Sequence, residues 1–444
     1  MLARLRYLAS DVRHWLSERR GRALGAVAAV LALGAAGVAG YLIADEGEAE
    51  GGSGGTEVLV GDVAGPEPPV ELGFPAVATA NTTRVPGADP IADAAAAALA
   101  VFPSAGGVPG PSAVTLVDAA DWAAGVAATS LMGDPIRAPV LLTDSGEVPD
   151  VTADAIDALR PAGAPETDDR QAFRVGDAAK PDGLSTLDVD GAGAAEVAVE
   201  LARLRARLTG GKPQHLLLVG SDEPAFAMPA AAWAARSGDP VLFLERNAVP
   251  EVTLDLLKAY EGVPVYVLGP ESAVSADALK QVREVAPDAQ RVGAEDAVAN
   301  AIAFARYADG TFGWNINDPG HGLVFANVER PLDAVAAAPL SASGSWGPLL
   351  ISDDASTIPE PLAAYLLDLK PGFEDDPTRA VYNHAWLVGD TSALDVSFQA
   401  RIDELIALAP IRSGSGADEF APQSGPTEPE GGGGSGGGQG ARNR

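Results

Sequence analysis

Arginine, aspartate and tryptophan side chains near the expected starts of helices are the residues of this chain best suited to binding chemistry. Arg84 and Arg291 each lie close to a glycine and a few residues before Asp89 and Asp296, respectively. A guanidinium presents a planar fork of five N–H donors, which suits contact with a glycan or a carboxylate. The same arginines could instead form salt bridges with these aspartates or with a neighbouring carboxylate, so both roles stay open.

Two further residue types bear on ligand contact. Asp333 lies at the start of an expected helix, where an aspartate favours capping the helix over acting as an acid. Trp122, Trp314 and Trp346 could stack on sugar rings or fill space in the core. The candidate ligand-binding residues are Arg84, Asp89, Trp122, Arg291 and Asp333.

Patterns for catalysis, metal binding and cofactor binding are weak. The chain has no cysteine, which excludes thiol nucleophiles and Cys-based zinc or iron–sulfur sites. Gly191 and Gly193 precede a helix as in a dinucleotide loop, but Glu196 replaces the third glycine and would repel a pyrophosphate. The histidines beyond residue 22 fall at non-equivalent positions: His215, His321 and His384. With no nucleophile–base pair, we predict no enzyme activity, no cofactor and no metal.

The elements that would position these residues recur three times. Short apolar runs at 114–118, 215–220 and 323–327 are each followed by an alanine-rich stretch with helical spacing and by a second apolar run. A third run in each copy ends in glycine, at 173–176, 265–269 and 385–389. Continuous apolar strands that alternate with helices indicate parallel sheets covered on both faces. The fold class is therefore α/β, with three tandem flavodoxin- or Rossmann-like repeats around a pseudo-threefold axis.

Composition narrows the possible partners. The chain has 444 residues, of which 47% are hydrophobic, and its formal net charge is −31. The hydrophobic content supports a large core. The negative charge argues against nucleic acid, since binding to phosphates needs clustered lysine and arginine.

The N-terminal sequence predicts a membrane anchor. Residues 1–22 are rich in arginine. Residues 23–44 carry no charge, and this apolar segment is long enough to span a bilayer. The positive-inside rule places residues 1–22 in the cytoplasm and the chain beyond residue 44 outside the membrane. We predict an uncleaved signal-anchor at 23–44, although small residues around 38–40 leave cleavage open.

The remaining boundaries follow from composition and from the recurring pattern. Residues 45–73 are a linker rich in glycine, proline and acidic residues, and residues 413–444 are a glycine-rich tail that we expect to be disordered. The three repeats are expected at 74–184, 185–290 and 291–412.

This pattern resembles the bacterial cell wall-binding repeat type 2 family. The similarity lies in residues 83–89 (TRVPGAD), 138–143 (APVLLT), 268–275 (LGPESAVS), 291–296 (RVGAED) and 332–337 (LDAVAA). The second repeat lacks the leading arginine, and the family's aspartate survives only as Asp333, with Ala124 and Ala225 at the equivalent places. The resemblance implies non-covalent attachment to anionic polymers of the cell wall.

These observations lead to one functional expectation and one alternative. We expect a membrane-anchored extracytoplasmic protein that binds a cell-envelope polymer through its three repeats. The negative charge argues against simple electrostatic capture of an anionic polymer. The alternative is an extracytoplasmic receptor for a small ligand, bound at the carboxyl ends of the strands.

Overall fold

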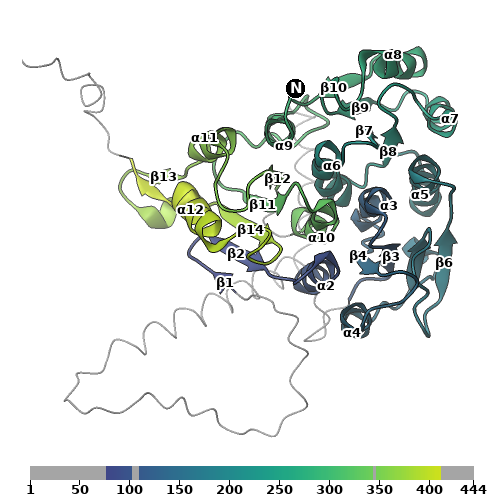
Figure 1. The fold of residues 1–444 in the computed structure, drawn as a ribbon, viewed down its shortest axis with the longest axis horizontal. Coiled ribbons are helices and arrows are strands. Elements are labelled where there is room, and N and C mark those ends of the chain that lie inside the picture. The colour runs from purple at the N-terminus through teal and green to yellow at the C-terminus, as the bar shows by residue number, and fades with distance from the viewer. Residues whose placement is uncertain (1–76, 103–109, 344–346, 412–444) are drawn as a thin grey trace, which may run out of the picture. The chain divides into compact units, whose positions relative to one another are not determined.

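Three sheets, each with four parallel strands, organise the part of the chain that the computed structural model describes, which is residues 77–102, 110–343 and 347–411 (Figure 1). The chain divides after Glu67, and all described residues belong to the second unit. The predicted α/β class and parallel sheets are confirmed. The predicted anchor at 23–44, the linker and the tail lie outside the described residues. Among the helices that are described, none is long and apolar enough to cross a membrane.

The strands of each sheet follow the predicted apolar runs closely. The first sheet has the order β4 (Val140–Thr143), β3 (Val114–Asp118), β5 (Ala172–Val175), β6 (Thr186–Val189). The second has the order β8 (Val241–Leu244), β7 (Leu216–Gly220), β9 (Val265–Leu268), β10 (Gln290–Val292). The third has the order β12 (Leu349–Ser352), β11 (Gly322–Asn327), β14 (His384–Val388), β2 (Thr82–Val85), and β1 (Val77–Ala78) pairs antiparallel with β2. A separate parallel pair joins β13 (Gly372–Phe373) to β15 (Ala409–Pro410).

The fourth strand of each sheet links it to the next stretch of sequence. β6 and β10 open the segments 185–290 and 291–412, yet they pair with β5 and β9 of the preceding segment. The third sheet receives its fourth strand, β2, from the N-terminal end of the described chain, where it pairs with β14. The two ends of the described chain are therefore joined through one sheet.

Alanine-rich helices pack where the three sheets meet. The helices that follow the first strand of each sheet, α3 (Trp122–Ala128), α6 (Pro224–Ser237) and α10 (Pro331–Ala342), contact one another. A Cβ added at Gly125 of α3 would lie 2.9 Å from Cγ2 of Val335 in α10. Small side chains therefore let these helices approach closely, and most of their residues are buried.

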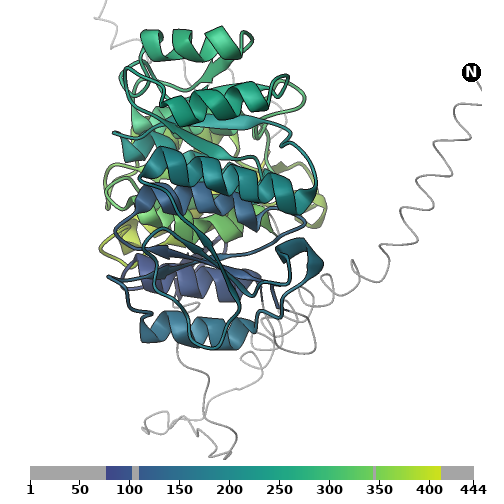
Figure 2. The same ribbon diagram turned by 90° about the vertical axis from the view of Figure 1, so that its right-hand side faces the viewer.

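The helices after the fourth strands pack across to another sheet. α2 (Pro90–Val101) packs on β4, α5 (Ala194–Thr209) on β8, and α9 (Ala297–Arg306) on β12, and each also contacts a helix of its own sheet, α10, α3 and α6, respectively. In Figure 2 the helices on the face toward the viewer run roughly parallel to one another. The other helices in the described part of the chain are α4 (Asp150–Leu159), α7 (Glu251–Ala259), α8 (Ala276–Val285), α11 (Glu360–Asp368) and α12 (Val396–Ile406), with short 3-10 turns at Thr129–Met132, Pro165–Thr167 and Pro377–Arg379.

Glycines fix the approach of each fourth strand to its helix. A Cβ at Gly87 would lie 2.3 Å from the backbone nitrogen of Asp93, and one at Gly191 would lie 2.6 Å from that of Val197. A Cβ at Gly293 would lie 2.5 Å from Oδ1 of Asn300. These distances are too short for any side chain, which explains why glycine stands at all three places.

Candidate functional site

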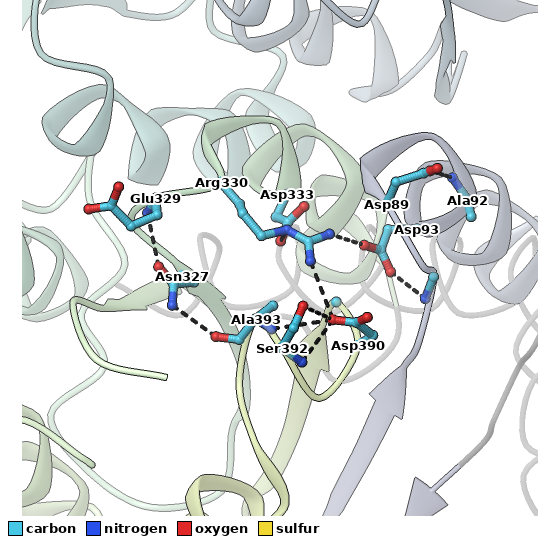
Figure 3. A network of polar contacts seen from close by, with 12 residues as sticks. Asp89, Ala92, Asp93, Asn327, Glu329, Arg330, Asp333, Asp390, Ser392 and Ala393 are labelled. Atoms are coloured by element: carbon cyan, nitrogen blue, oxygen red, sulfur yellow. Dashed lines mark hydrogen bonds and ion pairs between the residues drawn. The ribbon is translucent and has the colours of Figure 1, made fainter. Parts of the chain in front are cut away.

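The carboxyl edge of the third sheet gathers one arginine and several carboxylates (Figure 3). Nη2 of Arg330 lies 3.0 Å from Oδ2 of Asp93, and its Nε lies 2.8 Å from Oδ2 of Asp333. Its Nη1 lies 3.6 Å from Oδ1 of Asp390. We call these four residues the Arg330 cluster.

Three different segments supply the four residues of the Arg330 cluster. Arg330 occupies the N-cap position of α10, and Asp333 lies in the first turn of that helix. Asp93 lies in the first turns of α2, and Asp390 follows Gly389 after β14. Because β2, β14 and β11 are parallel neighbours, their carboxyl ends meet at one edge and bring these distant segments together.

Burial makes the Arg330 cluster electrostatically unusual. The side chains of Asp93 and Asp333 are 0% exposed and that of Arg330 is 20% exposed. The backbone N–H of Gly87 donates to Oδ1 of Asp93 at 2.6 Å, whereas Oδ1 of Asp333 is buried without a hydrogen-bond partner. Two buried carboxylates thus share one cation, which leaves excess negative charge in a low-dielectric place.

The pKa values of the two aspartates reflect this environment. Burial, and then the nearby Asp333, raise the pKa of Asp93 from 3.8 to about 8. Burial also raises the pKa of Asp333 to about 7, against the opposing effect of Arg330. The hydroxyl of Ser392 donates to Asp390 and lowers the pKa of that more exposed carboxyl. Near neutral pH the two buried aspartates therefore retain protons that free aspartates have lost.

Arg84 lies beside the Arg330 cluster, and its buried guanidinium forms hydrogen bonds to other residues of the protein. It is 1% exposed, and its Nε donates to Oε1 of Gln399 at 3.0 Å. Its Nη1 donates to the carbonyls of Gly389 and Asp390, both at 2.9 Å, and its Nη2 donates to the carbonyl of Asp395 at 3.3 Å. The predicted salt bridge with Asp89 is not its contact; Arg84 instead holds the loop between β14 and α12.

Arg291 performs the same task in the second sheet. It occupies the position in β10 that Arg84 has in β2, and it donates to the carbonyls of Gly269 at 2.7 Å and Val274 at 2.6 Å. In the first sheet, Asp188 stands at this position and pairs at 2.9 Å with Arg174 of the neighbouring strand. Arg174 then donates to the carbonyl of Ala178, so an arginine fastens the corresponding loop in all three sheets.

A substitution tests whether Arg291 is structural. Arg291→Met leaves two carbonyls without their donor, and we expect the free energy of unfolding to fall by about 1–3 kcal/mol. Arg401→Met is the control, since Arg401 is 53% exposed and its ion pair is with the also exposed Glu404 of the same helix, and we expect a change below about 0.5 kcal/mol. Denaturant unfolding of both variants measures the difference. Equal stability of the two variants would show that these carbonyl contacts contribute little.

The other predicted residues have separate surroundings. Asp89 caps α2 by accepting from the N–H of Ala92 at 2.9 Å, close to the Arg330 cluster. Trp122 is half-buried at the start of α3, and its ring meets that of Phe243 edge to face at 5.6 Å. Arg84, Asp89 and Asp333 are thus brought to one edge, whereas Arg291 and Trp122 lie elsewhere.

Two predictions at the helix starts were wrong. Asp333 is not the N-cap of α10, since Arg330 occupies that place; it is a buried residue of the first turn. Counted from the N-caps of α3 and α6, the places equivalent to Asp333 hold Ala124 and Phe226, not Ala225. The ion pair between Arg330 and Asp333 therefore belongs to the third sheet and has no counterpart at the equivalent places in α3 and α6.

Sequence reasoning missed Arg330, Asp93 and Asp390. A signal existed for Asp93, because an aspartate four residues into an alanine-rich helix must either face solvent or find a buried cation. Arg330 and Asp390 carried no such signal. Arg330 precedes Pro331 and Asp390 precedes Thr391, in polar stretches that are typical of exposed turns.

The three histidines also lie apart. His215 is buried, and its Nδ1 lies 3.0 Å from Oδ2 of Asp239, which also accepts from Nε1 of Trp233 at 2.9 Å. His384 lies 3.0 Å from the hydroxyl of Thr83, and His321 lies 3.5 Å from Asp318. Each histidine has its own polar neighbour, at a different place in the fold.

A cleft opens at the carboxyl edge of the second sheet. Its volume is about 640 Å³, and it lies between the first turns of α5 and α7, beyond the ends of β7 and β8. Ser221 and Glu245 line it where these two strands end. We call it the α5–α7 cleft. It occupies the place at which open α/β sheets commonly bind ligands.

Comparisons with known proteins find similarity in structure only. No family model and no curated protein sequence matches the chain. Cwp6 from Clostridium difficile superposes with a TM-score of 0.57 at 17% identity, over 72% of this chain and 48% of that one. Cwp8 from the same organism gives 0.57 at 18% identity, over 74% of this chain and 52% of that one. The chain therefore shares the fold of these proteins and spans about half their length.

Proposed function

We propose that this chain is a cell-surface protein that binds a cell-envelope polymer non-covalently through three α/β repeats of the type 2 cell wall-binding kind. The observation that carries the proposal is the fold shared with Cwp6 and Cwp8, over 72% and 74% of this chain. The motifs at 83–89 and 138–143 resemble the same repeat family in sequence.

The arrangement of the sheets supports a repeated binding unit. The three sheets have the same strand order, in which the second strand is at one edge and the borrowed fourth strand is at the other. We infer that they are tandem repeats packed around a pseudo-threefold axis, with α3, α6 and α10 near that axis. Such a unit offers a polymer several related surfaces, and multiple weak contacts along one polymer raise the overall affinity.

The charge of the chain bears on how it would hold the polymer. With a formal net charge of −31, long-range attraction cannot capture an anionic polymer. The proposal therefore relies on shaped, short-range contacts, which salt screens little. Residues 23–44 would tether the protein to the membrane, with the repeats outside the cell.

Co-sedimentation of the full chain with envelope fragments of its host, across a salt series, tests this function. We expect saturable binding that changes less than about threefold between 50 mM and 500 mM salt, since contact is not driven by net charge. Fragments stripped of polysaccharide by acid hydrolysis are the control, and we expect that the protein does not pellet with them. Absence of pelleting with intact fragments at every salt concentration would overturn the proposal.

The α5–α7 cleft favours a second candidate function, that of an extracytoplasmic receptor for a small ligand. A volume of about 640 Å³ is within the range of small-molecule sites. This function predicts a thermal shift with one metabolite and no association with envelope fragments. A metabolite screen by thermal shift, beside the co-sedimentation, separates the two functions.

A further inference from the structure

Among the described residues, an additional strand covers the outer edge of the fourth strand in the third sheet and not in the other two sheets. In the third sheet, β1 lies antiparallel on the outer edge of β2, with Val77 opposite Arg84. The N–H of Thr79 then donates to the carbonyl of Thr82 at 2.9 Å. The equivalent strand of the first sheet, β6, lies at the right-hand border of the ribbon in Figure 1. The third sheet thus shows that this kind of edge accepts an antiparallel strand.

The equivalence of β6 and β2 extends to individual backbone groups. The carbonyls of Ser185 and Val189 face β5 and accept from N–H groups of that strand and of the residue after it. Because backbone groups alternate in direction along a strand, those of Thr186 and Asp188 face away from β5. Thr186 is the counterpart of Thr82, whose carbonyl β1 uses.

These outward groups of β6 are available for pairing. Within the described part of the chain, the backbone N–H and C=O groups of Thr186 and Asp188 form no hydrogen bond. Thr186 is half-buried, and the side chain of Asp188 is 46% exposed. A row of unpaired backbone donors and acceptors at the border of a sheet is a template for a further strand. We call residues 185–190, with their outward backbone groups, the β6 edge.

Charge around the β6 edge selects the chemistry of such a strand. Asp188 pairs with Arg174 at 2.9 Å. The hydrogen bond from Arg174 to Asp188, and then the charges of Asp188, Asp190 and Asp177, raise the pKa of Arg174, so all three carboxylates lie near it. Lys180 is the second cation that acts on Asp188. Three carboxylates therefore outnumber two cations, and the local balance favours a basic strand.

A second copy of this chain fits the β6 edge poorly. An antiparallel pair of two β6 strands would bring the carboxylates of Asp188 and Asp190 from both copies together. Like charges on facing strands are destabilising, and each copy has a formal net charge of −31. The occupant that the charges favour is therefore a segment of a different protein.

We propose that the β6 edge binds an extended basic segment of a partner protein as an antiparallel strand. The segment's backbone groups pair with the outward N–H and C=O groups of Thr186 and Asp188. Its side chains alternate, with lysine or arginine on the face of Asp188 and apolar groups on the face of Leu187, which packs against the core. This interaction is separate from the proposed binding of a polymer and does not depend on it.

Hydrogen exchange on the full chain, resolved to single residues by mass spectrometry with electron-transfer fragmentation, tests the pairing. The probe is the extended hexapeptide TKVKVT, and the acidic hexapeptide TEVEVT is the control. In the free protein we expect the amides of Thr186 and Asp188 to exchange faster than those of Leu187 and Val189, which face β5. Saturating TKVKVT should slow exchange at Thr186 and Asp188 by about tenfold or more. TEVEVT should bind about tenfold more weakly, because it places like charges beside Asp188.

Substitutions at the β6 edge test the same pairing by fluorescence anisotropy of labelled TKVKVT. Thr186→Pro removes an outward N–H and leaves the bonds to β5 in place, since proline is tolerated on edge strands. We expect binding to weaken about fivefold or more. Asp190→Lys reverses an exposed charge outside the ladder, and we expect about threefold weaker binding, even where Thr186→Pro fails to fold. Glu284→Lys makes the same charge change on an exposed residue of α8 and should leave binding unchanged.

Several results would overturn this proposal. They are absence of binding by TKVKVT, equal binding of TKVKVT and TEVEVT, protection confined to residues outside β6, and unchanged affinity in both Thr186→Pro and Asp190→Lys. A dimer of the chain alone in sedimentation velocity, lost in Thr186→Pro, would also overturn it, because a second copy would then occupy the edge. Each of these results leaves co-sedimentation with envelope fragments, and thus the proposed function, unaffected.

Discussion

Arg330→Met is expected to lower the free energy of unfolding by about 3–5 kcal/mol at neutral pH, because it leaves two buried carboxylates without their cation. Asp93 and Asp333 are fully buried, and Arg330 lies 3.0 Å and 2.8 Å from them. Arg330 lowers the pKa values of both acids, so without it these values rise further, and the protons that the folded state must then hold cost more as the pH rises. Denaturant unfolding at pH 7 and at pH 5 measures the loss, and we expect it to be smaller at pH 5.

A compensated variant separates lost charge pairing from lost packing. The first sheet holds Ala124 and Val197 where the third holds Asp333 and Asp93, so Asp333→Ala and Asp93→Val have precedents in this chain. Combined with Arg330→Met, they replace the ionic groups by apolar ones, and we expect most of the stability to return. If the triple variant is as unstable as Arg330→Met alone, the loss comes from packing and not from unpaired charge.

Stability is expected to fall as the pH rises from about 4 to about 8, with the buried pair responsible for a large part of the change. The folded-state pKa values of Asp93 and Asp333, about 8 and about 7, both exceed the ordinary value of 3.8. The folded state therefore keeps protons that the unfolded state releases across this window, and each such proton costs about 1.4 kcal/mol per pH unit. The contribution of this pair to the free energy of unfolding is fully present below about pH 4 and is lost as the pH rises through the folded-state pKa values of the two aspartates.

The double variant Asp93→Asn with Asp333→Asn isolates this effect from the general self-repulsion of an acidic protein. Both chains carry the same other charges, so the difference between their unfolding free energies reports on the pair alone. Between pH 5 and pH 8.5 we expect the free energy of unfolding to fall by about 2 kcal/mol or more further in the wild type than in the variant, on the basis of about 1.4 kcal/mol per pKa unit. Parallel stability curves for the two proteins would contradict the raised pKa values. Because the two acids interact, they titrate as a pair.

The two predictions share one structural consequence. The Arg330 cluster ties α2, near the N-terminal end of the described chain, to α10 and to the loop after β14. Arg84 of β2 holds the same loop through Gly389 and Asp395. The closing contact between the two ends of the described chain thus combines strand pairing, four arginine hydrogen bonds and a buried ion cluster. Variants of this contact are expected to affect the whole unit more than variants of Arg291.

Several features could be predicted from residue patterns alone. The apolar runs at 114–118, 265–269 and 385–389 form β3, β9 and β14, because continuous apolar strands suit sheets buried on both faces. Asp89 and Asp296 precede helices and cap them, since their short side chains reach the free N–H groups of the first turn. These are local properties, set by side-chain chemistry and by spacing within one helix or strand.

Only the tertiary structure decided which segments meet. The sequence places β2 at the beginning of the first predicted repeat, but β2 pairs with β14, some 300 residues away, because an edge strand satisfies its N–H and C=O groups wherever the packed sheets present a partner. That pairing brings Asp93 and Arg330 together across 237 residues and turns Arg84 inward onto the loop after β14. Local patterns contain no information on such contacts, because buried charges choose their partners only when the sheets have assembled around them.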